Sequence, residues 1–116
     1  MPRHFALLLV ISIQVWRLPC LCLNRIKNGF DIERIKELYK SKYTGPLVTY
    51  SDECEEGFIS AGILSGKDSM IVSVYGNEDR IILVARYDNL GKGASGAAVE
   101  CLNIVLGNTD TNGLEI

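Results

Sequence analysis

The chain has few of the residues that metal sites and nucleic-acid surfaces require. It contains a single histidine, His4, and its four cysteines do not form two close doublets with histidines at zinc-ligand spacing. The 12 basic residues are outnumbered by 14 acidic ones, and the lysines are scattered among acids. We therefore expect no structural metal and no nucleic-acid partner.

The chain is also too short for much internal division. Its 116 residues, of which 47% are hydrophobic, can bury one modest core. A cofactor domain and a separate substrate domain would not both fit. We expect one domain, or a piece of one.

One apolar run, FALLLVISIQVW at residues 5–16, follows a positively charged start and has the length of the apolar part of a secretory signal. It is too short for a clear membrane-spanning helix, and no small-x-small cleavage site follows it. A buried strand, a buried helix, or a start region that does not belong to the fold are the alternatives.

From residue 30 onward the pattern is regular. Asp31 precedes apolar residues at helical spacing in IERIKELYKSKY, which predicts an amphipathic helix that ends at residues 44–46 and is followed by a short strand at 47–50. The acidic stretch SDECEEG, residues 51–57, lacks the calcium-loop pattern and predicts a solvated loop.

The second half of the chain predicts a hairpin and a helix. Residues 70–75 and 80–87 are rich in β-branched side chains and are separated by GNED, and the nearly continuous apolar character of the second run predicts a central strand. An apolar helix face follows and ends at Gly107, with Cys101 expected as a small core residue on it. This order predicts an α+β fold with a mostly antiparallel sheet and packed helices.

The junction DNLGKGASG, residues 88–96, joins the predicted central strand to that helix. Its glycines allow positive φ or close backbone approach, and free N–H groups at the helix start favour an anion. Glycines at such a junction also serve tight turning and helix-to-sheet packing. The spacing matches neither the Walker pattern nor a dinucleotide fingerprint.

The segment ARYDNLGKGASGAAVECLNIVLGNTDTNGL strongly resembles the carboxy-terminal part of the N-acetyl-gamma-glutamyl-phosphate reductases, members of the semialdehyde dehydrogenase superfamily. The residues that match the family pattern are Asp88, Asn89, Leu90, Lys92, Gly93, Ala94, Gly96, Ala98, Asn103, Gly107, Thr111, Gly113 and Leu114. The resemblance implies that residues 30–116 are a fragment of the carboxy-terminal, dimerisation-type domain of such an enzyme.

The resemblance also implies a function. Members of the family use NADPH and a cysteine thiolate to convert an acyl phosphate to N-acetylglutamate semialdehyde in arginine biosynthesis. By this resemblance Asn89 lies near the nicotinamide, Lys92 and Gly93 help to line the cofactor cleft, and the following helix packs beneath it. A cytoplasmic homo-oligomer that acts on a small acyl phosphate, away from membranes, is the implied context.

The chain departs from the family in two ways. It lacks the Gly-Cys-Tyr-Pro-like motif of the nucleophile, and neither Cys54, which lies among carboxylates, nor Cys101 replaces it. Residues 1–29 do not match; a truncated gene or a shifted reading frame would explain this, and we expect them to pack poorly or to dock as an apolar helix. His4, which precedes RLP, is the candidate for the family's catalytic histidine.

Three functions remain open on the sequence alone. The first is a part of an NADP-dependent N-acetyl-gamma-glutamyl-phosphate reductase that is inactive by itself. The second is a part of a related acyl-phosphate reductase such as an aspartate-semialdehyde dehydrogenase, against which Gly96, Asn103 and the Thr-x-Gly-Leu tail argue. The third is a non-enzymatic exported or interaction module, which only residues 5–16 and the missing nucleophile favour.

Overall fold

A single mixed sheet organises the fold. The computed structural model describes residues 10–11, 15–23, 31–53, 59–60, 62–77 and 80–116. Within them the sheet has five strands, in the order β1-β2-β5-β4-β3. The strands are β1 (Val10–Ile11), β2 (Val15–Leu23), β3 (Val48–Tyr50), β4 (Met70–Gly76) and β5 (Arg80–Asp88). Strands β3 and β4 pair in parallel, and the other neighbours pair antiparallel, so the predicted α+β fold is confirmed.

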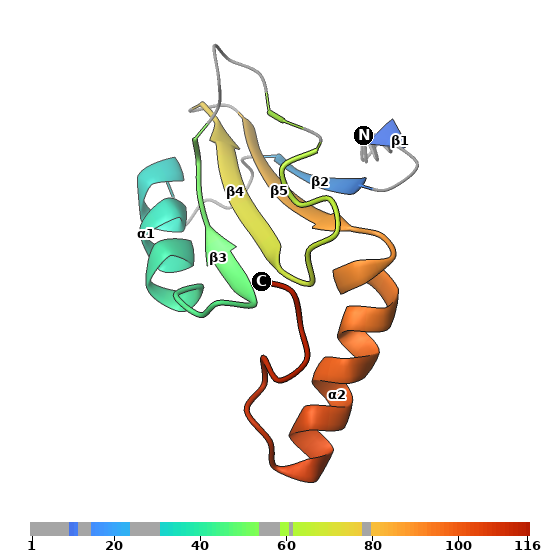
Figure 1. Ribbon diagram of the computed structural model, residues 1–116. Coiled ribbons are helices and arrows are strands. Elements are labelled where there is room, and N and C mark those ends of the chain that lie inside the picture. The colour runs from blue at the N-terminus through green and yellow to red at the C-terminus, as the bar shows by residue number, and fades with distance from the viewer. Residues whose placement is uncertain (1–9, 12–14, 24–30, 54–58, 61, 78–79) are drawn as a thin grey trace.

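Strand β5 lies at the centre of the sheet, as its apolar sequence predicts (Figure 1). It forms the predicted hairpin with β4, in a register that runs from Met70 opposite Tyr87 to Gly76 opposite Ile81. The buried hydrophobic side chains of the described residues come from these two strands and the loop before them: Leu64, Val74, Ile81 and Val84. The core is small and is centred on the hairpin.

The amino-terminal segment contributes to the sheet. Strand β2 pairs antiparallel with β5 along its whole length, from Val15 opposite Asp88 to Leu23 opposite Arg80. The expectation that residues 1–29 pack poorly or form an apolar helix is therefore wrong for residues 15–23. The physical reason is that a central apolar strand has two rows of backbone groups to pair, and β4 satisfies only one of them. The division of the chain at residue 29 stays a prediction.

Helix α1 (Ile32–Lys42) is the predicted amphipathic helix and packs against β4 and β3 (Figure 1). Asp31 caps it as expected, because its Oδ1 accepts the backbone N–H of Arg34 at 2.8 Å. The first turn carries Glu33 and the last carries Lys40 and Lys42, which complements the helix dipole.

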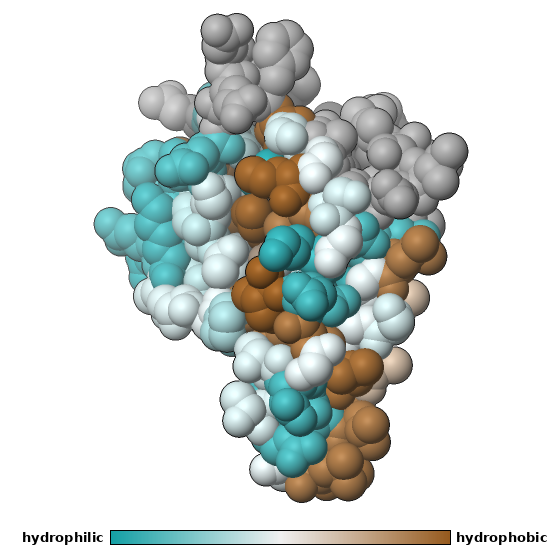
Figure 2. Space-filling model, in the orientation of Figure 1, coloured by the Kyte–Doolittle hydropathy of each residue, from teal (hydrophilic) through white to brown (hydrophobic). Residues whose placement is uncertain are grey.

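The second helix has two parts. Residues Gly91–Ser95 form η1, a π-helical turn, and α2 (Gly96–Leu106) continues from it to Gly107, whose φ of 69° ends the helix as predicted. Helix α2 projects away from the sheet (Figure 1). Apolar residues gather on the surface along it (Figure 2). Its exposed apolar residues are Leu102, Ile104, Val105 and Leu106.

Cys101 corrects one expectation. It is a free and exposed thiol rather than a small core residue. The periodicity of α2 identified an apolar helix face, but the sheet of this chain does not cover that face.

In the described part of the chain, neither helix is long and apolar enough to cross a membrane.

Candidate functional site

Asp88 organises the junction between β5 and the helix. Its side chain is 3% exposed, and its Oδ1 accepts the backbone N–H groups of Leu90 at 2.8 Å and Gly91 at 2.9 Å. Its Oδ2 accepts the N–H of Gly66 at 2.8 Å. These bonds, led by that from Gly91, hold the pKa of the Asp88 carboxyl below its ordinary value against the opposing effect of burial. The N–H groups that a ligand anion could use at residues 90 and 91 are thus bound by a carboxylate of the chain itself.

The glycines of the junction serve close packing. None of the three junction glycines, Gly91, Gly93 and Gly96, has a positive φ angle. The junction therefore does not need glycine at these positions for its backbone conformation. A Cβ atom on Gly91 would lie 2.4 Å from the backbone oxygen of Lys67, and one on Gly96 would lie 2.2 Å from Oδ1 of Asp68. The loop that carries residues 67 and 68 therefore rests directly on the helix backbone, as the packing alternative predicts.

Gly93 differs from its two neighbours. It is exposed, and a Cβ atom there would lie 3.2 Å from both the Asp88 oxygen and the Tyr87 ring. The contact is tight but is made in part with a side chain. Gly93 thus presents solvent-exposed backbone next to the strand end, while a side chain in its place would press on the Asp88 backbone oxygen and the Tyr87 ring.

Lys92 already has a partner. Its Nζ forms a hydrogen-bonded ion pair with Glu100 Oε2, and the two side chains are 10% and 23% exposed. Glu100 follows Lys92 by eight positions, so the pair joins η1 to the fifth residue of α2. Sequence reasoning missed Glu100, because helix side-chain pairs are sought at spacings of three or four residues.

Asn89 lies beside these groups, half-buried at the end of β5. The structure thus brings together the three residues that the resemblance assigns to the cofactor, namely Asn89, Lys92 and Gly93. An amide, an ammonium and an open backbone surface suit the polar parts of a dinucleotide. The residue types suit such a ligand, their assignment to a cofactor stays a prediction, and Lys92 shares its ammonium with Glu100.

Asn103 fixes the segment that follows α2. The residue is buried, and its Nδ2 donates to the backbone oxygens of Asp110 at 3.2 Å and Asn112 at 2.8 Å. The chain then returns to the loop below the junction, where Glu115 N donates to Asp68 Oδ2 at 3.0 Å and Asp68 N donates to Glu115 O at 2.6 Å. The family-pattern residue Asn103 therefore has a structural role.

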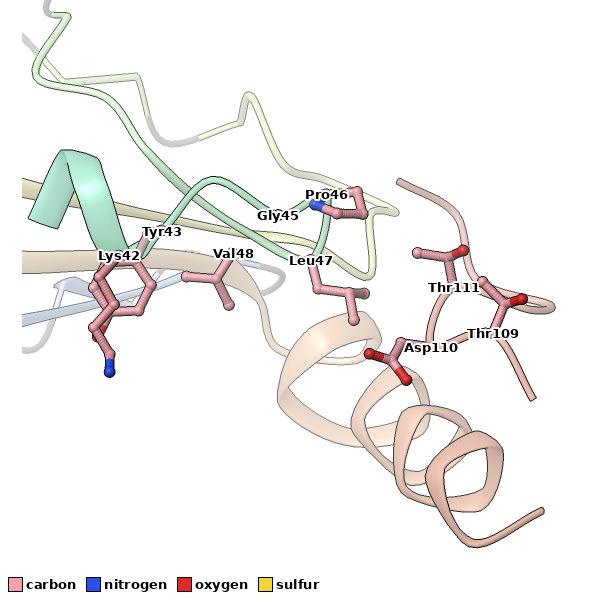
Figure 3. Close-up of a pocket in the computed structure, with 9 residues that line it drawn as sticks. All are labelled: Lys42, Tyr43, Gly45, Pro46, Leu47, Val48, Thr109, Asp110 and Thr111. Carbon is pink, nitrogen blue, oxygen red and sulfur yellow. The ribbon is translucent and has the colours of Figure 1, made fainter. Parts of the chain in front are cut away.

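A groove of about 430 Å³ lies between the α1–β3 connection and the segment after α2 (Figure 3). Its lining residues are Lys42, Tyr43, Gly45, Pro46, Leu47, Val48, Thr109, Asp110 and Thr111. None of the predicted cofactor residues lines it. Figure 3 shows the Asp110 side chain turned toward Leu47, whereas the Lys42 ammonium points away from the 109–111 segment.

Two predicted features lie outside the described residues: the candidate histidine His4, and Cys54 in the acidic loop. Among the side chains that the structure describes, no group of three or more His, Cys, Asp or Glu is placed to hold a metal ion. The candidate site is accordingly the junction at residues 88–96 with Glu100.

Several curated proteins are similar to this chain. The chain is 37% identical over 103 residues to N-acetyl-gamma-glutamyl-phosphate reductase 2 of Nostoc sp., which covers 84% of this chain and 32% of that protein. It is also 37% identical over 93 residues to the N-acetyl-gamma-glutamyl-phosphate reductases of Brucella ovis and Brucella canis, covering 75% of this chain and 30% of each relative. No protein-family model matches the chain.

The chain thus spans about a third of the length of these curated relatives. The similarity covers most of the chain and agrees with the residues of the junction that carry the family pattern. The chain is therefore a homologue of the N-acetyl-gamma-glutamyl-phosphate reductases, related to them over a stretch that makes up about a third of their length.

Proposed function

We propose that this chain is the carboxy-terminal part of an NADP-dependent N-acetyl-gamma-glutamyl-phosphate reductase of arginine biosynthesis, inactive by itself. The observation that carries the proposal is the 37% identity to proteins of that name over 84% of the chain. The clustering of Asn89, Lys92 and Gly93 at the end of β5 supports it, because these residues fit the polar parts of a dinucleotide.

The chain's own residues would bind and orient the cofactor. When bound, NADPH supplies the hydride that reduces the acyl group to the aldehyde. Asn89 and Gly93 would present an amide and an open backbone surface to it, and Lys92 would present its ammonium. Asp88 would act indirectly, because its three hydrogen bonds fix the backbone conformation of the turn that carries these residues.

The missing parts would come from the remaining two thirds of a full-length enzyme. They include the nucleophilic cysteine, whose family motif this sequence lacks. The exposed apolar residues of α2 support the idea that another part of such an enzyme packs there, since contiguous apolar surface on a protein is typically an interface. In this proposal the complete enzyme is a cytoplasmic homo-oligomer that acts on a small acyl phosphate, without nucleic acid or membrane.

A chimera tests the proposal. Residues 30–116 of this chain replace the aligned segment of the Brucella ovis relative, and NADPH oxidation is followed with N-acetylglutamyl phosphate and, separately, with aspartyl phosphate. We expect turnover of N-acetylglutamyl phosphate in preference to aspartyl phosphate. The unmodified relative serves as the reference for folding, oligomeric state and rate.

Two results would contradict the proposal. A chimera that folds and assembles like the reference but oxidises no NADPH with either substrate would show that the chain does not supply a reductase part. Preference for aspartyl phosphate would favour the related acyl-phosphate reductases instead.

A further inference from the structure

Lys92 and Glu100 form an ion pair that is both shielded from solvent and in direct contact. Both side chains are largely shielded from solvent, at 10% and 23% exposure, and their charged atoms are in direct contact. Gly96 lies midway between them in sequence. The ion pair therefore bridges η1 and α2 across a glycine.

A paired ammonium attracts an anion less strongly than a free one. The Glu100 carboxylate neutralises the charge of Lys92 and takes one of its three N–H donors. The pair carries no net charge, so a phosphate that approaches Lys92 must compete with the Glu100 carboxylate for the ammonium.

We propose that Glu100 controls anion binding at Lys92, in that a phosphate-bearing ligand binds there only by taking the ammonium over from the Glu100 carboxylate. The proposal deepens the proposed function and rests on the assignment of Lys92 to the cofactor. Glu100 is then a positioning residue that holds Lys92 along α2 until an anion replaces it. Its removal would leave a shielded ammonium without a partner, which favours a replacement anion.

The test uses inorganic pyrophosphate as the probe and the complete chain as the protein. Its binding is measured by calorimetry for the wild type, E100Q, E100D and the double variant K92M/E100Q. We expect E100Q to bind on the order of tenfold more tightly than the wild type, the scale of one charge-assisted hydrogen bond, and E100D to stay near the wild type. The double variant should lose the gain. E37Q is the matched control, since Glu37 is an exposed glutamate on α1 and its neutralisation changes the net charge equally.

The proposal is overturned if E100Q binds pyrophosphate no more tightly than the wild type or E37Q, or if the gain survives in K92M/E100Q. A second measurement needs no variant and uses amine acylation followed by mass spectrometry. Lys92 should be modified roughly several-fold more slowly than the exposed Lys40 and Lys42, because its ammonium is shielded and paired. Addition of about 10 mM pyrophosphate should change the acylation rate of Lys92 and leave the rates of Lys40 and Lys42 unchanged, because it displaces Glu100 from the ion pair. Equal rates at the three lysines would also overturn it, whether or not E100Q folds.

These outcomes separate the inference from the proposed function. A gain in E100Q that depends on Lys92, together with an inactive chimera, would keep the control of anion binding and remove the reductase assignment. An active chimera with no gain in E100Q would keep the assignment and remove the role of Glu100.

Discussion

Replacing Asp88 tests whether its carboxylate holds the junction together. In Asp88→Asn, Oδ1 can still accept from Leu90 and Gly91, but the amide nitrogen replaces Oδ2 and faces the N–H of Gly66, donor against donor. The N–H of Gly66 loses its acceptor inside a part-buried turn, and the two remaining bonds lose their charge. We expect Asp88→Asn to destabilise the chain by about 2 kcal/mol, and Asp88→Ala, which orphans all three donors, by about 4 kcal/mol.

The same replacement makes a prediction about pH. The pKa of Asp88 is lower in the folded chain than its ordinary value of 3.8, because three backbone N–H groups stabilise the charged form. Its contribution to stability is therefore complete above pH 3.8 and is lost as the pH falls through the folded-state pKa. The difference between wild type and Asp88→Asn should shrink over that window.

Urea unfolding followed by far-ultraviolet circular dichroism, repeated from pH 2 to pH 6, measures both effects. Asp110→Asn is the matched control, since Asp110 is an exposed carboxylate. The midpoint of thermal unfolding should fall by roughly 10 °C for Asp88→Asn at neutral pH. The reasoning is refuted if Asp88→Asn stays within about 0.5 kcal/mol of the wild type, the range of ordinary surface substitutions, or if its deficit is independent of pH.

The remaining predictions concern a tyrosine, a glycine and the isolated chain. Burial, and next the carboxylate of Asp52, raise the pKa of Tyr50 to about 12, so Asp52→Asn should bring it back only part of the way toward 10 in a spectrophotometric titration; a full return would give Asp52 the whole effect. Gly91→Ala should cost about 1–3 kcal/mol in urea unfolding because the new Cβ meets the Lys67 carbonyl, whereas Gly45→Ala, with open space around it, should not. The purified chain should oxidise no NADPH with N-acetylglutamyl phosphate, since the nucleophile has no replacement; turnover that disappears on mutating one of its four cysteines would contradict this.

The elements that could be predicted from the sequence are those with local causes. Asp31 caps α1 through an N–H three residues away, and Gly107 ends α2 through its own backbone conformation. The hairpin of β4 and β5 was likewise indicated by two apolar runs with a short turn between them. Each signal lies within a few residues of its effect.

The features that could not be predicted depend on distant partners. The pairing of β2 with β5 joins residues from 57 positions apart (Leu23 and Arg80) to 73 positions apart (Val15 and Asp88), and nothing in the amino-terminal run specifies it. The exposure of Cys101 depends on what covers α2, which periodicity does not reveal.

The candidate site shows the same limit. Asn89, Lys92 and Gly93 were named by resemblance, and the structure places them together, but their contact with a cofactor stays a prediction. The turn bonds from Leu90 and Gly91 to Asp88 could have been anticipated, because an aspartate often accepts backbone N–H groups two and three residues onward. The bond from Gly66 and the pair with Glu100 could not, at separations of 22 and 8 residues.

The measurement that tests the central claim most directly is the NADPH kinetics of Asn89→Ala and Lys92→Met in the chimera with the Brucella ovis relative. If the junction faces the cofactor, kcat/KM for NADPH should fall by about tenfold or more in each variant, the scale of one lost polar contact, while KM for N-acetylglutamyl phosphate changes little. Thermal unfolding checks that Asn89→Ala folds like its parent. NADPH kinetics equal to those of the parent chimera in both variants would contradict the claim and leave the junction a packing feature.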